Sequence, residues 1–384
     1  MVMEKLFRLM ADKKASDLFF STGAAIHIKI IGNSMPLYHQ KLDGAAIRGL
    51  LGEILTEQQW AEFDSHHELN LGHELPGVGG FRLNVFMQRS GPGCVIRFIP
   101  NEIPPPEALN LPKVLQELVM EKRGLVLVVG ATGSGKSTTL ASMLDYRNEN
   151  KSGHILTFED PIEFAFKSKR SIVNQRQIGT DTKSLAAGLK NAMRQAPDCI
   201  LIGEIRDMES MSHAIAYAQS GHLVLATLHA NNANNALNRI VSFYTPENRQ
   251  VLLSDLSSTL KGIVSQRLIN SLQGGRIPAV EVLLNSRHVA ELIEKGDLDE
   301  VKEAMEKSLV PGSKTFEQAL MDLVRDELVS RDEALAQADS PTHLLWLLEN
   351  AGLANAVPTD PGKRKIKEEE PEEGTSFTKF LIDT

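Results

Sequence analysis

Two different spacings of apolar residues follow one another along the N-terminal part of the 384-residue chain. Apolar residues between Leu6 and Met10 lie on one short helical stripe, whereas Ile26 to Ile30 alternates strictly between apolar and polar residues, as a half-buried strand does. A second alternating stretch at 81–86, turn residues at 90–93 and a strand-like stretch at 94–99 together predict a hairpin. Residues 1–100 are therefore expected to form a small α+β domain.

Prolines interrupt this pattern between the first domain and the rest of the chain. Pro100, Pro112 and the run from Pro104 to Pro106 cannot continue a helix or a central strand, because proline fixes φ and lacks a backbone N–H. We therefore expect a proline-rich linker at 101–113.

Beyond the linker, short apolar runs alternate with segments of helical period. The runs are continuous and rich in Val, Ile and Leu, which is typical of parallel strands buried on both faces. Such strands are expected at 125–129, 155–158, 199–202 and 223–228, and helices at 136–147, 182–195 and 208–219. The alternation predicts an α/β core at 114–285, with a parallel sheet covered on both faces by helices. A mostly helical region is expected at 286–350, and the polar, block-charged residues 351–384 are expected to form a disordered tail.

The segment after the strand at 125–129 carries a phosphate-binding motif. Its sequence, GATGSGKS at 130–137, fits the pattern G-x-x-x-x-G-K-[ST], and a segment of helical period follows it. In such a loop the glycines let backbone N–H groups turn toward phosphate, the lysine reaches the β- and γ-phosphates, and the serine hydroxyl ligates Mg²⁺. The expected ATP-binding residues are Gly130, Ala131, Thr132, Gly133, Ser134, Gly135, Lys136, Ser137 and Thr138, with Ser137 also on the metal.

Carboxylates stand at the ends of two later strands. One strand leads into Glu204, which is our candidate for polarising the attacking water. The earlier strand leads into Glu159, Asp160 and Glu163. Strand ends are often acidic, so for Glu159 and Glu163 a plain surface role competes with a role in the site.

A histidine and several arginines are further candidates. His229 closes a strand and is a candidate sensor of the γ-phosphate, while an ordinary structural role fits its position equally well. His222 opens the same strand seven residues earlier, so the two imidazoles lie far apart and cannot share one metal. Arg82, Arg89 and Arg97 lie in the predicted hairpin, and an arginine from a neighbouring domain or subunit can meet the charge of a transition state.

Charge and composition exclude several classes of function. The chain carries 41 Lys and Arg against 49 Asp and Glu, a net charge of −8, and only 5% aromatic residues, which disfavours a protein that binds nucleic acid over a broad basic surface. The cysteines Cys94 and Cys199 are too few for a disulfide framework or a multi-cysteine zinc site. A charged N-terminus and the lack of any run of about 18 apolar residues predict a cytoplasmic protein that touches membranes only through its partners.

Taken together, these segments resemble a known family: the secretion ATPases of type II and type IV pilus systems, and within it the pilus retraction motors of the PilT/PilU type. The resemblance extends over about residues 1–339. It rests on four ordered motifs: the phosphate loop, LTFEDPIEF at 156–164, LIGEIRD at 201–207 and GHLVLATLHAN at 221–231. It implies a homohexamer with an N-terminal PAS-like domain and a RecA-like P-loop NTPase domain, which hydrolyses ATP with Mg²⁺.

The resemblance also implies roles for individual residues. Glu163 would lie in the acidic box and ligate the metal, Glu204 would be the catalytic glutamate, and His229 would face the γ-phosphate. Arg82 and Arg97 would complete the site from the N-terminal domain. We expect that replacing Arg97 slows turnover with little effect on stability.

Two departures from the principal retraction motor resemble the PilU branch, the accessory retraction ATPases. The principal motor carries AIRNLIRE on a helix after the core, whereas this chain has HVAELIEK at 288–295, with Ala290 and Glu294 in place of the two arginines. The tail after Asp339 is the second departure. We therefore expect an accessory ATPase of twitching motility that acts with a second pilus retraction ATPase and on an inner-membrane platform protein. The alternatives are a RecA-like nucleic-acid motor and an ATP-binding scaffold that hydrolyses little.

Overall fold

The computed structural model describes residues 1–353 with the exception of 31 and 101, so nearly all of the expected tail lies outside the described residues. The described residues form two compact units, Met1–Glu102 with Glu163–Ala165, and Ile103–Ile162 with residues 166–353. Among them, none of the helices combines the length and the apolar character that a membrane crossing needs.

The first unit is built on a six-stranded sheet with the order β3-β2-β1-β6-β5-β4, in which all neighbouring strands are antiparallel. The helix predicted near Leu6 and the strand predicted near Ile28 are confirmed as α1 and β2. Its elements are α1 (Val2–Asp12), β1 (Asp17–Ser21), β2 (His27–Ile30), β3 (Asn33–Pro36), α2 (Gly44–Leu51), α3 (Glu57–His66), β4 (Glu68–Leu75), β5 (Gly79–Gln88) and β6 (Gly91–Pro100).

β5 and β6 form the predicted hairpin, but its turn lies earlier than expected. Gln88 pairs with Gly91, so the turn consists of residues 89–90, and Gly91 and Gly93 already belong to β6. A side chain at Gly93 would collide with the ring of Phe86, whose atoms lie 2.8 Å from the Cβ position. The glycine signal in this segment therefore marks close packing within the strand, and the predicted position of the turn is wrong.

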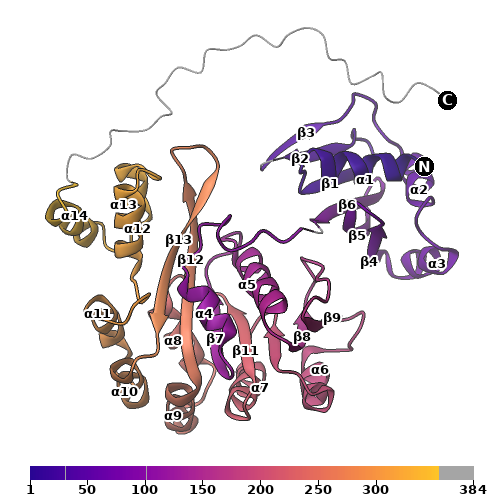
Figure 1. Cartoon of the computed structure of the whole chain (residues 1–384). Helices are drawn as coiled ribbons and strands as arrows, with labels where there is room; N and C mark the ends of the chain where they lie inside the picture. Colours follow the sequence, from indigo (N-terminus) through magenta and orange to yellow (C-terminus); the bar gives the residue numbers. More distant parts are fainter. Residues whose placement is uncertain (31, 101, 354–384) are drawn as a thin grey trace. The chain divides into compact units, whose positions relative to one another are not determined.

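The second unit contains a seven-stranded sheet with the order β13-β12-β7-β11-β10-β8-β9 (Figure 1). All neighbours are parallel except β12 and β13, which are antiparallel. The four predicted strands are confirmed as β7, β8, β10 and β11, whereas β9, β12 and β13 were not expected. The strands are β7 (Gly124–Val129), β8 (Gly153–Glu159), β9 (Ser171–Gln177), β10 (Cys199–Ile202), β11 (Leu223–Leu228), β12 (Leu260–Asn270) and β13 (Arg276–Leu284).

Helices cover both faces of this sheet, as the continuous apolar strands predict. Leu125 and Leu127 of β7 pack in one core with α6 to α9, while Val126 and Val128 pack in a second core with α4 and α5. This alternation explains why β7 is apolar at every position. The helices are α4 (Val114–Met120), α5 (Lys136–Asn150), α6 (Leu185–Ala192), α7 (Met208–Gln219), α8 (Ala233–Ser242) and α9 (Arg249–Thr259), with short 3₁₀ turns η1 (Met193–Gln195) and η2 (Pro246–Asn248).

The region after β13 is helical, as predicted. It comprises α10 (Arg287–Lys295), η3 (Leu298–Glu300), α11 (Val301–Glu306), α12 (Phe316–Arg325), α13 (Arg331–Gln337) and α14 (Pro341–Asn350). α10, α12, α13 and α14 each begin at a Ser or Thr whose hydroxyl accepts a backbone N–H of the first turn. The last three helices pack against Ile269 of β12 and Ile277 of β13, which attaches them to the sheet edge.

Candidate functional site

The phosphate-binding segment begins where β7 ends, between two other strands. Val129 pairs with the last residue of β11 on one side and with Ser265 of β12 on the other. The next residues of these parallel strands therefore lie side by side at the same edge of the sheet, about 4.8 Å apart from strand to strand. Gly130 thus has His229 on one side and Gln266 on the other.

The loop from Gly130 to Gly135 turns at its glycines and leads directly into the N-terminus of a helix. Gly133 and Gly135 have φ angles of 79° and 89°, a region that favours glycine. α5 starts directly after Gly135, and no described side chain caps its N-terminus. The first backbone N–H groups of α5, and the positive end of its dipole, therefore point into the loop. These residues fit a bound phosphate.

Lys136 closes the loop on itself. Its Nζ donates to the carbonyl oxygen of Gly130 at 2.8 Å and to that of Ala131 at 2.9 Å. Both acceptors are neutral, whereas hydrogen bonds between an ammonium and a charged phosphate are shorter and stronger. A nucleotide phosphate is therefore a better partner for this ammonium than the carbonyls that it contacts here.

Glu204 lies between two potential cations at the same edge of the sheet. Its Oε1 is 3.1 Å from Nε2 of His229. Its Oε2 accepts a hydrogen bond from Arg206 Nε at 2.7 Å and lies 2.7 Å from Arg206 Nη2. This pairing raises the pKa of Arg206. The structure thus brings together the two candidates Glu204 and His229, and it adds Arg206, which the sequence analysis did not single out.

Backbone contacts on both sides hold the segment that carries Glu204. Gly203 N–H donates to the Phe158 carbonyl at 2.7 Å, and Ile205 N–H donates to the Thr227 carbonyl at 2.9 Å. The Thr227 hydroxyl also donates to the Gly203 carbonyl. A side chain at Gly203 would lie 2.9 Å from the Phe158 carbonyl, so only glycine fits. The position of Glu204 is therefore set by β8 and β11.

The remaining candidates for metal binding and acid–base chemistry are Glu159, Glu163 and Ser137. Glu159 ends β8, and its Oε1 accepts from Thr157 Oγ1 at 2.6 Å and from Gln175 Nε2 at 3.0 Å. Glu163 is exposed in the segment between β8 and β9, and Ser137 is the second residue of α5. The metal-binding roles of Ser137 and Glu163 stay predictions.

Arg82 and Arg97 lie opposite each other on β5 and β6. Arg97 Nε donates to Asp17 Oδ1 at 2.9 Å, and Asp17 is only 4% exposed. Removing Arg97 would deprive a buried carboxylate of its cation, which destabilises a protein. The expectation that its replacement has little effect on stability is therefore revised, and its role at the nucleotide stays a prediction.

Thr227, Arg206 and Gln266 are the residues at this edge that the sequence analysis missed. Thr227 and Arg206 lie within the motifs around His229 and Glu204, so their closeness in sequence was an available signal. Gln266 had no local signal, because it contacts Ser134 across a sequence separation of 132 residues.

A second group of ionisable residues lies among the C-terminal helices. Glu306, Glu317 and His343 offer atoms that all lie within 4.8 Å of one another, as metal ligands do. Lys302 Nζ, however, is 3.2 Å from Oε1 of the fully buried Glu317. A lysine thus already supplies positive charge to this group, which we interpret as an ion-paired link between α11, α12 and α14.

Known proteins match the chain over most of its length. Residues 107–277 match the family described as "Type II/IV secretion system protein". The type IV pilus ATPase PilU of Pseudomonas aeruginosa is 45% identical over 350 residues, which cover 91% of this chain and 92% of that protein. The type IV pilus retraction ATPase PilT of the same organism is 38% identical, covering 89% of this chain and 99% of that protein.

Solved structures agree with these matches. A crystal structure of the pilus retraction motor PilT with bound ADP has a TM-score of 0.82 and 37% identity, covering 88% of this chain and 97% of that chain. The ATPase DotB of Legionella pneumophila has a TM-score of 0.76 and 26% identity, covering 88% of this chain and 96% of that chain. The relatives therefore share both units of the fold.

Lys136→Ala is expected to weaken ADP and ATP binding at least tenfold, because each hydrogen bond from a charged group to phosphate contributes about 1.5 to 3 kcal/mol. Binding is measured by titration with a fluorescent ADP analogue. Lys151→Ala is the matched control, since Lys151 Nζ also donates to a backbone carbonyl, that of Met120 at 3.0 Å, near the opposite end of α5. Equal nucleotide affinity in the two variants would remove the phosphate-loop assignment.

Glu204→Gln is expected to keep ATP bound and to lower its hydrolysis at least about a hundredfold, because an amide preserves the shape of the side chain but cannot act as a general base. Phosphate release and ATP affinity are measured on the same preparation. Glu209→Gln, an exposed change in the first turn of α7, is the control. A Glu204→Gln variant that loses ATP affinity while its bound ATP still turns over would show that Glu204 is a binding residue.

Proposed function

The chain belongs to the type II/IV secretion system protein family and is an ATPase of the type IV pilus kind, and on that premise we propose that it is an accessory pilus retraction motor. The observation that carries its chemistry is the edge of the sheet where the loop after β7 lies beside His229 and the Glu204 segment. Membership of this family also argues against the alternative of a nucleic-acid motor.

In the proposed mechanism, ATP binds with its phosphates in the loop that precedes α5. Lys136 exchanges its two carbonyl partners for the β- and γ-phosphates, and the N–H groups of the loop bind the same oxygens. Ser137 and Glu163 would hold Mg²⁺, which would reduce the negative charge of the phosphates. Glu204 polarises the attacking water, and His229 contacts the γ-phosphate.

We also propose that the working form is a homohexamer. Arg82 and Arg97 then reach a nucleotide when units or subunits close around it, and their guanidinium groups meet the charge that develops on the transferred phosphoryl group. Turnover would therefore depend on assembly, and ATP-driven closure would supply the movement that acts on an inner-membrane platform protein.

The outward face of α10 supports the accessory role. Val289, Leu292 and Ile293 are buried against the rest of the unit, whereas Glu294 is exposed and Ala290 half-exposed. Where the principal motor presents two arginines, this surface therefore presents a methyl group and a carboxylate. Exchanging two cations for a neutral and an anionic side chain changes which partner the surface attracts.

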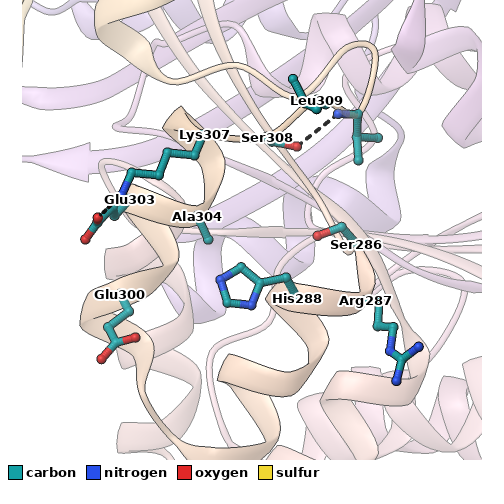
Figure 2. Close-up of a pocket in the computed structure, with 10 residues that line it drawn as sticks. Ser286, Arg287, His288, Glu300, Glu303, Ala304, Lys307, Ser308 and Leu309 are labelled. Carbon is teal, nitrogen blue, oxygen red and sulfur yellow. Dashed lines mark hydrogen bonds and ion pairs between the residues drawn. The ribbon is translucent and has the colours of Figure 1, made fainter.

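A pocket of about 530 Å³ lies at the start of α10 (Figure 2). It is lined by residues 286–288, by residues of η3 and α11, and by the loop 308–310. Leu309 in that loop is 96% exposed, and the lining carries both charge signs, for example Glu303 and Lys307. In our proposal this pocket and α10 contact a second retraction ATPase.

An Asp17→Asn, Arg97→Ala double variant is expected to have a maximal ATP turnover rate at least about tenfold below that of Asp17→Asn alone, because an arginine that acts in phosphoryl transfer contributes strongly to the rate. The Asp17→Asn background removes the buried charge that Arg97 neutralises, so the comparison isolates turnover from stability. Equal rates in the two proteins would exclude Arg97 from the site.

An Ala290→Arg, Glu294→Arg double variant is expected to keep the ATPase rate of the native chain and to lower co-purification with the PilT-type ATPase of the same organism at least about fivefold, since the surface charge is reversed. Ala61→Arg with Glu57→Arg is the matched control, because it makes the same two exchanges four residues apart on the exposed face of α3. Unchanged co-purification would show that the α10 face does not contact this partner.

A further inference from the structure

Gln266 is a buried polar residue that adjoins the phosphate loop. It lies on β12, is 3% exposed and pairs with Val280 of β13. It directly follows Ser265, where β12 pairs with β7 on one side and with β13 on the other. Such a doubly paired strand is a rigid support. The side chain of a buried glutamine requires hydrogen-bond partners. Here one partner belongs to the phosphate loop and the other to α5, the helix that follows it.

Both ends of the Gln266 amide are used. Nε2 donates to the Ser134 carbonyl at 2.9 Å, and Oε1 accepts from Thr139 Oγ1 at 2.7 Å. Because a carbonyl only accepts, the NH₂ group must face Ser134, and the orientation of the amide follows. Gln266 thus connects the loop to the first turn of α5 through one planar group.

The bond to Ser134 also sets the direction of a donor in the loop. In a trans peptide the C=O of one residue and the N–H of the next point in opposite directions. A Ser134 carbonyl that is held against Gln266 therefore turns the Gly135 N–H away from β12, toward the interior of the loop. The same packing explains the glycine at 135, where a Cβ would lie 2.7 Å from Gln266 Nε2.

We propose that Gln266 is a positioning residue of the ATPase reaction. Its amide holds the Ser134–Gly135 peptide so that, before nucleotide binds, the loop N–H groups already point to where the β-phosphate will lie. It deepens the proposed function and rests on the phosphate loop being the nucleotide site. Preorganised donors bind more tightly because no ordering cost arises on binding. A glutamate would keep the contact with Thr139 but could not donate to Ser134, and it would bring a negative charge near the phosphates.

The test uses the full-length chain with Gln266→Met, which keeps the length of the side chain and removes both hydrogen bonds. Affinities for ADP and AMP are measured by titration, and amide hydrogen exchange is measured for residues 131–137. We expect the affinity for ADP to fall at least about tenfold while that for AMP, which lacks the β-phosphate, changes less than about twofold, with faster exchange in the loop.

Gln219→Met is the matched control, because Gln219 Nε2 donates to Asp255 on the exposed end of α7. It should leave both affinities unchanged. Thr139→Val removes only one of the two bonds and should give a smaller loss of ADP affinity. Combined with Gln266→Met it should add little, because the two residues form one unit.

Each remaining outcome decides the proposal. Equal losses for ADP and AMP would assign Gln266 a merely structural role, and an unchanged ADP affinity would overturn the inference outright. If Gln266→Met does not fold, the uncharged Gln266→Leu replaces it and must lose more ADP affinity than Thr139→Val while AMP affinity changes less than about twofold. Loss of ADP binding in Lys136→Ala with none in the Gln266 variants contradicts this inference alone, whereas retained binding in Lys136→Ala contradicts the nucleotide site itself.

Discussion

The parallel pairing of β7 with β11 and β12 is the constraint on which the nucleotide site depends. Backbone hydrogen bonds fix Val129 beside the ends of both neighbours, so the residues that follow each strand meet at one edge. Apolar side chains on both faces of β7 lie in separate buried cores and hold the strand in place. This pairing places the loop beside His229, while the pairing of β10 with β11 and β8 brings the Glu204 segment to the same edge.

The charged groups at this edge already have partners within the chain. Lys136 contacts two loop carbonyls, and Glu204 contacts Arg206 and His229. ATP would replace neutral partners of Lys136 by charged ones, which favours binding. Glu204, in contrast, has Arg206 on Oε2 and His229 near Oε1, so a water that it polarises has to share the carboxylate with these two side chains.

Local patterns were sufficient to predict the strands at 199–202 and 223–228 and the helix at 208–219, because continuous apolar runs and helical period are read within a dozen residues. β9 is a partly polar edge strand, and β12 carries Ser, Gln and Arg in its centre, so neither has the apolar signature of a buried strand. The phosphate loop is likewise a local motif. Gln266 owes its position to sheet pairing with residues that are distant in sequence. The spacing of residues along the chain therefore could not predict its contact with the phosphate loop.

The central claim is that the phosphate loop and Glu204 form one hydrolytic site. It is tested most directly by a structure of the full-length chain with Mg²⁺, ADP and aluminium fluoride, which imitates the transferred phosphoryl group. The account predicts Lys136 Nζ on the phosphate oxygens in place of the Gly130 and Ala131 carbonyls, and a Glu204 oxygen within about 3.2 Å of the in-line water. A bound analogue with Glu204 still fully paired to Arg206 and no water within its reach would contradict it.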